Sequence, residues 1–314
     1  MEKCRLRWQN QVSAREERTN SMTSSWMLIA GALFATMGVF AKMLATQFTG
    51  AELSLFRSAT GLIVVGIFVA WKRESLATAF AKEHFWRGLT GTISLIGYFY
   101  AMTKLPLATA ITLNYTSPLW LTLLSTLLLG ERFRARLVVA IMLGFIGVGL
   151  LLRPTFSGEN AHAGFIGLAS GFFAACAYVN VKKLGSAGEP GWRVVFYFSL
   201  FGTIGAAMTQ GAIERNFNPV NANNIGLLLG VGVAATLAQL AMTRAYFRGN
   251  TLVVGAFAYS TVVFASIAGI FFFDEILPPI AWVGMATIIA SGLLAKSGGE
   301  KSQDTVPALP VEED

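Results

Sequence analysis

Two long apolar runs, 144 positions apart, end in the same way: Leu127-Leu128-Leu129-Gly130-Glu131 and Phe271-Phe272-Phe273-Asp274-Glu275. At the same offset Tyr115 falls on Tyr259. Similarity at a fixed offset indicates an internal duplication rather than a coincidence of apolar composition. The chain is therefore predicted to contain two copies of one unit.

The amino-acid composition indicates whether that unit lies in water or in a lipid bilayer. The 314 residues are 54% hydrophobic and only 13% charged, with a mean hydropathy of +0.58. Such a chain has too little polar surface to coat a water-soluble globule, which favours a lipid bilayer. A membrane barrel would show short segments of alternating polarity, but these runs are continuously apolar. We therefore expect an all-α membrane protein.

A bilayer core about 30 Å thick needs about 20 apolar residues per helix. Ten such spans are predicted: 26–45, 53–71, 86–104, 106–129, 136–152, 163–181, 193–212, 225–243, 251–273 and 279–296. Gly31 and Lys42 in the first span match Gly171 and Lys182 in the sixth, so each copy holds five spans. Because the first span belongs to this repeat, it is not read as a cleavable signal sequence.

The predicted organisation has four parts. These are a polar tail over 1–24, a five-helix repeat over 25–155, a second five-helix repeat over 160–297, and a polar tail over 298–314. The first 21 residues have no counterpart in the second copy, which makes Met22 an alternative start.

The basic residues predict the orientation, because cytoplasmic loops carry an excess of Lys and Arg. A cytoplasmic N-terminus places 19 of the 24 basic residues inside, Arg87 among them, and leaves Arg57 within a span. Four lie at the other face: Lys42, Lys104, Arg153 and Arg215. Both termini are thus expected in the cytoplasm, with the chain in the inner membrane. The net charge of +7 reflects this topology, and no nucleic-acid partner is expected.

Five spans per copy is an odd number, so the second copy enters the membrane from the opposite side. This predicts an inverted repeat about a pseudo-two-fold axis in the membrane plane, as in many secondary transporters. Two inverted copies can exchange conformations, which suits alternating access to a site between them.

Several motifs occur in an order and spacing that resemble one known group. They are Glu52-Leu-Ser-Leu-Phe-Arg57, Arg87-Gly88, Leu105-Pro106-Leu107-Ala108, Tyr115-Thr-Ser-Pro118-Leu, Leu129-Gly130-Glu131-Arg132 and Gly144-Phe-Ile-Gly-Val-Gly149. From about residue 25 to 297 the chain resembles the drug/metabolite transporter superfamily, EamA type. The resemblance implies a ten-helix solute carrier without a cofactor. Members carry amino acids, nucleosides, vitamins or S-adenosylmethionine, so the resemblance does not choose the solute.

Arg57 is the clearest candidate for solute contact, because an ionisable group within a span is costly and is by default functional. Ser54 and Gly61 lie on the same helical face and would line a cavity with it. The alternative is structural: Arg57 extends outward to the interface or pairs with Glu52.

Polar and aromatic residues inside the spans form the second candidate set: Tyr98, Asn114, Tyr115, Tyr178, Asn180, Gln239, Tyr246 and Tyr259. Their hydroxyls and amides need partners, in a neighbouring helix or in a watery cavity. Tyr115 and Tyr259 match across the repeat near mid-span, which places them by the axis, where the site is expected. Pro118 is expected to kink the fourth span.

Two other patterns have structural readings. Glu131 and Glu275 are expected to end their helices and pair with nearby Arg residues, and no carboxylate lies in the middle of a span. Pairs of glycines four residues apart allow close helix packing, within the bundle or in a homodimer. These pairs are Gly167 with Gly171 and Gly226 with Gly230.

A membrane enzyme and a channel are the rival functions. The two histidines, His84 and His162, lie beside loops on opposite faces, while Cys4 lies in a tail and Cys176 in a span. No catalytic residue, metal site or cofactor is therefore expected. A channel would show a filter or ring motif, and none is visible. The predicted function is secondary transport of a small organic metabolite, with the solute and the lipid bilayer as partners.

Overall fold

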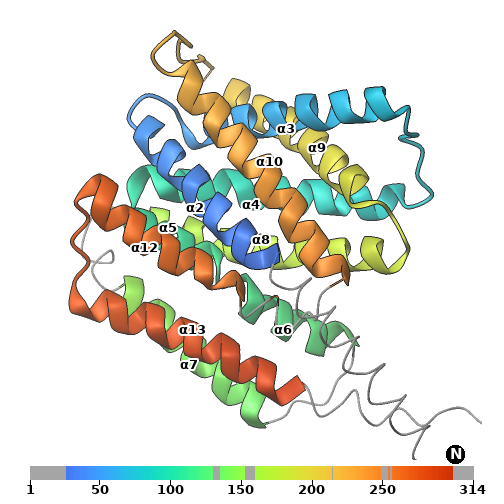
Figure 1. Ribbon diagram of the computed structural model, residues 1–314. Coiled ribbons are helices and arrows are strands. Elements are labelled where there is room, and N and C mark those ends of the chain that lie inside the picture. Colours follow the sequence, from blue (N-terminus) through green and yellow to red (C-terminus); the bar gives the residue numbers. More distant parts are fainter. Residues whose placement is uncertain are drawn as a thin grey trace, which may run out of the picture.

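The computed structural model describes residues 26–129, 135–152, 160–213, 215–248, 254 and 257–299. Every regular element in these ranges is a helix (Figure 1). The helices are α2 (Trp26–Leu44), α3 (Gly50–Lys72), α4 (Ala81–Lys104), α5 (Leu107–Asn114), α6 (Ser117–Leu129), α7 (Ala135–Leu152), α8 (Ala161–Ser186), α9 (Gly191–Ile213), α10 (Ile225–Arg248), α12 (Ser260–Phe273) and α13 (Pro279–Gly299). The predicted all-α fold is confirmed.

Five of the described helices are long and apolar enough to cross a membrane: α2, α3, α8, α9 and α10. The apolar α12 is shorter, with 14 residues. These helices fit a membrane protein, while ten crossings stay a prediction from the sequence.

The fourth expected span is two helices rather than one kinked helix. α5 ends at Asn114, a turn follows at Tyr115 and Thr116, and α6 begins at Ser117. Pro118 lies in the first turn of α6, where a missing N–H costs nothing. In the second half Tyr259 is the N-cap of α12. Tyr115 is the C-cap of α5, so both matched tyrosines lie at helix ends. Discontinuous helices of this kind are typical of transporter sites.

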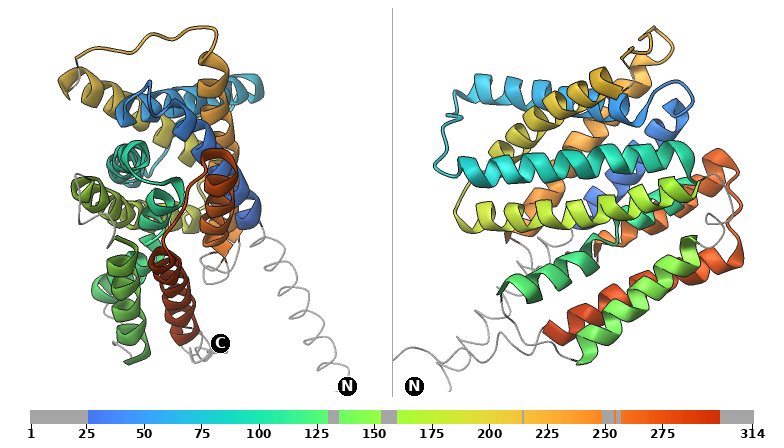
Figure 2. Two further views of the ribbon diagram at one scale, coloured as in Figure 1. Left: turned by 90° about the vertical axis from the view of Figure 1, so that its left-hand side faces the viewer. Right: turned by 180° about the vertical axis from the view of Figure 1, so that it is seen from behind.

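The most extensive helix contacts join the two halves of the chain: α4 with α8, α7 with α13, α2 with α10, and α3 with α9 (Figures 1 and 2). Exchanging each helix for its repeat counterpart turns the α2–α10 pair into the α8–α4 pair. The same exchange leaves α3–α9 and α7–α13 unchanged. The pairing pattern is thus the one that a two-fold relation between the halves requires.

Three of the four paired glycines serve contacts inside the bundle. A Cβ on Gly167 would lie 3.0 Å from Leu113, and one on Gly171 would lie 2.5 Å from the Thr116 hydroxyl, so α8 packs closely on the fourth span. Gly230 of α10 faces Phe40 of α2 in the same way. These three glycines are explained by packing within one chain. A Cβ on Gly226 would meet nothing within 4 Å, and a homodimer stays a prediction.

Candidate functional site

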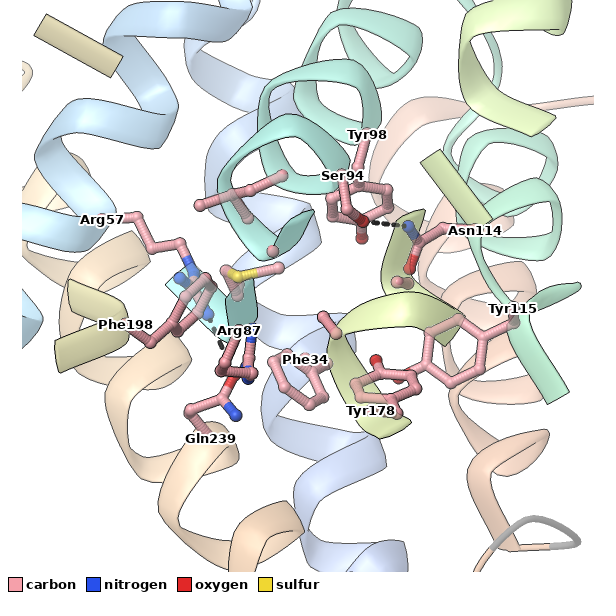
Figure 3. A pocket seen from close by; sticks show the side chains of 15 residues that line it. Phe34, Arg57, Arg87, Ser94, Tyr98, Asn114, Tyr115, Tyr178, Phe198 and Gln239 are labelled. Atoms are coloured by element: carbon pink, nitrogen blue, oxygen red, sulfur yellow. Dashed lines mark hydrogen bonds between the residues drawn. The ribbon is translucent and has the colours of Figure 1, made fainter. Parts of the chain in front are cut away.

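A small cavity lies between the two halves, with a volume of about 60 Å³. Its walls come from α2, α3, α4, α8, α9, α10 and the break between α5 and α6 (Figure 3). Ten of the lining residues are labelled there: Phe34, Arg57, Arg87, Ser94, Tyr98, Asn114, Tyr115, Tyr178, Phe198 and Gln239. Both halves of the chain thus contribute chemistry to one site.

One end of the cavity is cationic. Arg57 of α3 and Arg87 of α4 lie against the ring of Phe198, with their guanidinium carbons 5.0 Å and 3.9 Å from the ring centroid. Both side chains are buried, with 5% and 2% of their surface exposed. Arg57 also donates from Nη2 to Oε1 of Gln239 over 3.4 Å, which links α3 to α10.

These two cations have no ionic partner among the residues that the structure describes. The ion pairs found there both involve Glu189, far along the chain in the α8–α9 connection. Glu52, the partner that the structural reading of Arg57 required, instead accepts hydrogen bonds from the backbone N–H of Thr49 and from Asn218. Arg57 therefore neither extends to the interface nor pairs with Glu52.

The other end of the cavity is polar, and the amide donor of Asn114 is bonded there. Asn114 donates from Nδ2 to the hydroxyls of Ser170, at 3.0 Å, and Ser94, at 3.4 Å. Ser94 in turn donates to the backbone oxygen of Ser170 over 2.8 Å. Tyr98, Tyr115 and Tyr178 surround this network (Figure 3). The tyrosines give that end an aromatic wall.

The structure brings six of the nine residues singled out in the sequence together around the cavity: Arg57, Tyr98, Asn114, Tyr115, Tyr178 and Gln239. The remaining three lie elsewhere. Tyr246 stacks on Tyr178 with ring centroids 5.6 Å apart, so it lies behind the wall. Asn180 donates to the Cys176 oxygen of its own helix over 3.0 Å, and Tyr259 is buried outside the lining.

Arg87 is the main correction to the sequence-based assignment, which counted it as a cytoplasmic charge. The signal for its place was present on α4, where Arg87, Gly91, Ser94 and Tyr98 are spaced by four, three and four residues. That spacing puts them on one helical face. All four line the cavity. Phe198 carried no such signal, because one phenylalanine in an apolar span resembles any other.

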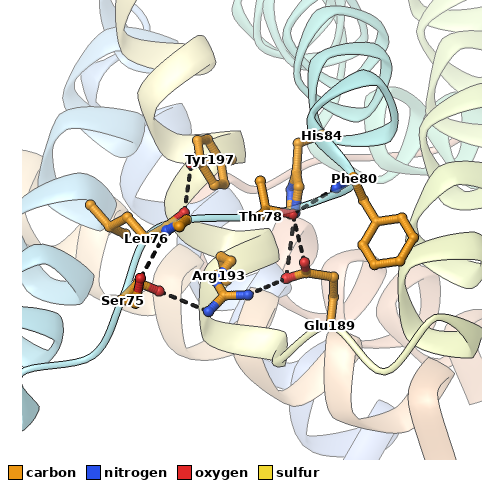
Figure 4. Close-up of polar contacts among 9 residues, drawn as sticks. Ser75, Leu76, Thr78, Phe80, His84, Glu189, Arg193 and Tyr197 are labelled. Carbon is orange, nitrogen blue, oxygen red and sulfur yellow. Dashed lines mark hydrogen bonds and ion pairs between the residues drawn. The ribbon is translucent and has the colours of Figure 1, made fainter.

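A polar cluster closes one end of the bundle (Figure 4). Glu189 accepts hydrogen bonds from the Thr78 hydroxyl at 2.6 Å and from Nη1 of Arg193 at 2.9 Å. Arg193 also donates to the Ser75 oxygen over 2.7 Å, and Tyr197 donates to the Leu76 oxygen over 2.8 Å. These bonds tie the connection between α3 and α4 to the start of α9. We call this set of contacts the α9 latch.

A corresponding cluster lies at the opposite end. Glu52, at the start of α3, accepts from the backbone N–H of Asn218 at 2.6 Å and from its side chain at 2.8 Å. Thr49 donates to Oε1 of Gln210 over 2.6 Å. These bonds tie the start of α3 to the end of α9 and the connection that follows it. This α3 latch is the counterpart of the α9 latch under exchange of the halves.

The family model described as the EamA-like transporter family matches residues 21–153 and again residues 163–295. The chain belongs to the EamA-like transporter family. Its internal duplication is therefore the family unit occurring twice. The cavity of this EamA-like protein lies where the two units meet.

Relatives agree with this assignment. The pseudopaline exporter CntI of Pseudomonas aeruginosa is 29% identical, over 84% of this chain and 92% of the exporter. A riboflavin transporter of Vibrio cholerae is 29% identical, over 85% and 90% of the two chains. An S-adenosylmethionine uptake transporter of Rickettsia bellii is 23% identical, over 88% and 94%. The EamA-like chain is a transporter of the membrane and not an enzyme.

A solved crystal structure shares the fold. It is 19% identical, with a TM-score of 0.66, and the match covers 91% of this EamA-like chain and 100% of the other. The arrangement of helices is therefore one already seen by experiment.

Proposed function

We propose that this EamA-like protein is a secondary carrier that moves a small organic metabolite across the cytoplasmic membrane by alternating access. The observation that carries the proposal is the cavity lined by both halves, with Arg57 and Arg87 from the first and Phe198 and Gln239 from the second. A site between two such units opens to either side as the units rock. The metabolites named for the relatives are small organic compounds, which supports this class of cargo.

The size of the cavity supports a carrier over an open pore. About 60 Å³ holds roughly two water molecules, whereas sites for small organic ligands measure about 300–1,000 Å³. A metabolite enters only when the halves separate at one end. The α3 latch and the α9 latch are both formed here, which supports a state of the carrier in which neither latch has been released.

The proposed orientation places both termini and the α9 latch in the cytoplasm, because the basic residues concentrate on that side. The α3 latch then faces the outside. Release of one latch at a time exposes the cavity to one side at a time. The six residues named from the sequence that line the cavity, with Arg87 added, are the proposed cargo-binding set, while Asn180, Tyr246 and Tyr259 stay predictions from the sequence.

Purified full-length protein in proteoliposomes tests the proposal. Compounds that raise its Tm in a metabolite screen are offered as radiolabelled cargo, because a ligand of the folded state raises apparent stability. We expect saturable uptake, recovery of the compound chemically unchanged, and no conduction of small ions. A chemically altered product would indicate an enzyme, and unsaturable flux with ion conduction would indicate a channel.

A further inference from the structure

The two guanidiniums in the cavity lack a countercharge. Arg57 and Arg87 are buried at 5% and 2% exposure and form no ion pair with any described residue. Burying an unpaired charge costs several kcal/mol. Phe198 offers both cations the negative face of its ring, which offsets part of this cost without neutralising the charge. The cavity therefore holds two positive charges that an anionic ligand would balance.

Unused hydrogen-bond donors gather at the same place. Nε of Arg57, Nε of Arg87 and Nε2 of Gln239 are buried and have no partner among the residues that the structure describes. Oε1 of Gln239 already accepts from Arg57, so the free part of that amide is its donor. Arginine has donors only, and an ionised carboxylate or phosphate has acceptors only. Anionic oxygens are therefore the groups that would pair with the donors at this end of the cavity.

The remaining walls describe the rest of the ligand. Tyr98, Tyr115 and Tyr178 present rings around the end away from the arginines, and the ring of Phe34 lies between Arg87 and Tyr178 (Figure 3). The Nδ2 group of Asn114 at that end is bonded to serines. This end suits an apolar or aromatic body.

We infer that the cavity takes an organic anion, with a carboxylate or phosphate group held between Arg57 and Arg87 and an apolar or aromatic body against the tyrosines. The inference deepens the proposed function and rests on it for the claim that the bound ligand is transported. It excludes purely cationic cargo, because two buried guanidiniums would repel it.

The first test uses the empty protein. We compare the Tm of Arg57→Gln and Arg87→Gln with that of wild type and of Lys104→Gln, which removes an exposed charge at the other end of α4. Unpaired buried cations destabilise the protein when no ligand is bound. Removing one of them should therefore give each cavity variant a Tm equal to or above that of the wild type. A Tm below that of Lys104→Gln in both cavity variants would assign the arginines a structural role and overturn the inference.

The second test uses matched probes on purified full-length protein: phenylacetate with phenylacetamide, indole-3-acetate with indole-3-acetamide, phenyl phosphate with phenol, and phenethylamine as the cation. At least one anion should raise the Tm saturably, while its uncharged partner and the amine do not. The Kd of that anion should weaken by about tenfold or more in Arg57→Gln and Arg87→Gln, and should stay unchanged in Lys104→Gln. Stabilisation by uncharged or cationic probes alone, or by none, would overturn the inference.

The two proposals fail in different ways. An anion that binds through Arg57 and Arg87 but is not taken up by proteoliposomes would contradict carriage and leave the anion site standing. Saturable uptake of an uncharged compound, equal in wild type and Arg57→Gln, would contradict the anion site and leave the carrier standing.

Discussion

The hydroxyl of Thr78 donates a hydrogen bond of 2.6 Å to the carboxylate of Glu189, and this contact joins the two halves of the chain. Burial acts to raise the pKa of Glu189, but the hydrogen bonds from Thr78 and Arg193 outweigh it and hold the pKa below its ordinary value. The carboxylate is therefore ionised at neutral pH, where its bonds to the latch are strongest. Two of the four hydrogen bonds of the α9 latch depend on this one charge.

Glu189→Gln should loosen the α9 latch and expose the cavity from that end. Hydrogen bonds to a charged group contribute about 1.5–3 kcal/mol, so the open population should rise by about tenfold or more. The measurement is the rate at which an impermeant maleimide labels Ala177→Cys, a cavity position, in a Cys4→Ser, Cys176→Ser background. Glu74→Gln, an exposed carboxylate in the α3–α4 connection that the latch holds, is the control. Equal labelling rates in the two variants would show that Glu189 does not hold this end closed.

The buried His84 should make stability depend on pH. Its ring lies 4.6 Å from that of Tyr197, and Nε2 lies 3.7 Å from Glu189, just before the third predicted span. Burial lowers the pKa of His84, against the attraction of Glu189 and with some repulsion from Arg193. The folded protein thus resists a proton that the unfolded chain takes up near pH 6.5, roughly. Stability is undiminished above that pH and falls as the pH drops below it, toward the lower pKa of the folded state.

A series of Tm measurements from about pH 8 to about pH 5 checks this sign. In His84→Gln the Tm should lose part of its fall at acid pH, whatever its value at neutral pH. His162→Gln changes an exposed histidine and should keep the wild-type profile. The same acid slope in His84→Gln and wild type would assign the pH dependence to other groups.

The sequence predicted the helical membrane fold because continuous apolar runs and a fixed repeat offset are properties of the chain itself. It also placed Tyr115 and Tyr259 at matching points, and the structure puts both at helix ends. It did not predict that the fourth span divides into α5 and α6, since a proline near mid-span is compatible with a kink or a break. The difference depends on packing against α8.

Site residues were predictable where the chemistry was unusual for the membrane. Arg57 and Gln239 are polar groups within apolar runs, and both line the cavity. Arg87 was assigned to the cytoplasm because it lies at the start of its span. Its place in the cavity could be inferred only from the helical face of α4 that it shares with Tyr98. Asn180 was chosen by the same polarity rule, yet its amide is satisfied within its own helix. Polarity in the sequence alone does not distinguish a polar residue that lines the cavity from one that bonds within its own helix.

Glu275 has a different partner from the arginine expected for it, and Glu131 lies outside the described residues. Oε1 of Glu275 accepts a hydrogen bond of 2.6 Å from the backbone N–H of Leu107, at the start of α5. A carboxylate there accepts from a free helix N–H and is attracted to the positive end of the helix dipole. Glu275→Ala should therefore lower the free energy of unfolding by about 0.5–2 kcal/mol.

Glu275→Gln keeps an acceptor without the charge and should lose less. Thermal or denaturant unfolding of purified protein measures the series, with Asp274→Asn as a control at the neighbouring exposed carboxylate. An unfolding free energy that is equal in Glu275→Ala and wild type would show that solvent replaces the carboxylate at no cost.

Phe198 should be energetically coupled to the arginines that it contacts. Because its ring lies 3.9 Å from the Arg87 guanidinium carbon, Phe198→Leu removes a cation–π contact and keeps most of the apolar volume. That contact is worth about 0.5–2 kcal/mol, so the substitution should destabilise wild type more than it destabilises Arg87→Gln. A double-mutant cycle on the unfolding free energy measures the difference. Phe196→Leu, two residues earlier on α9, should give the same loss in both backgrounds. Equal losses for Phe198→Leu as well would show that the ring only fills space.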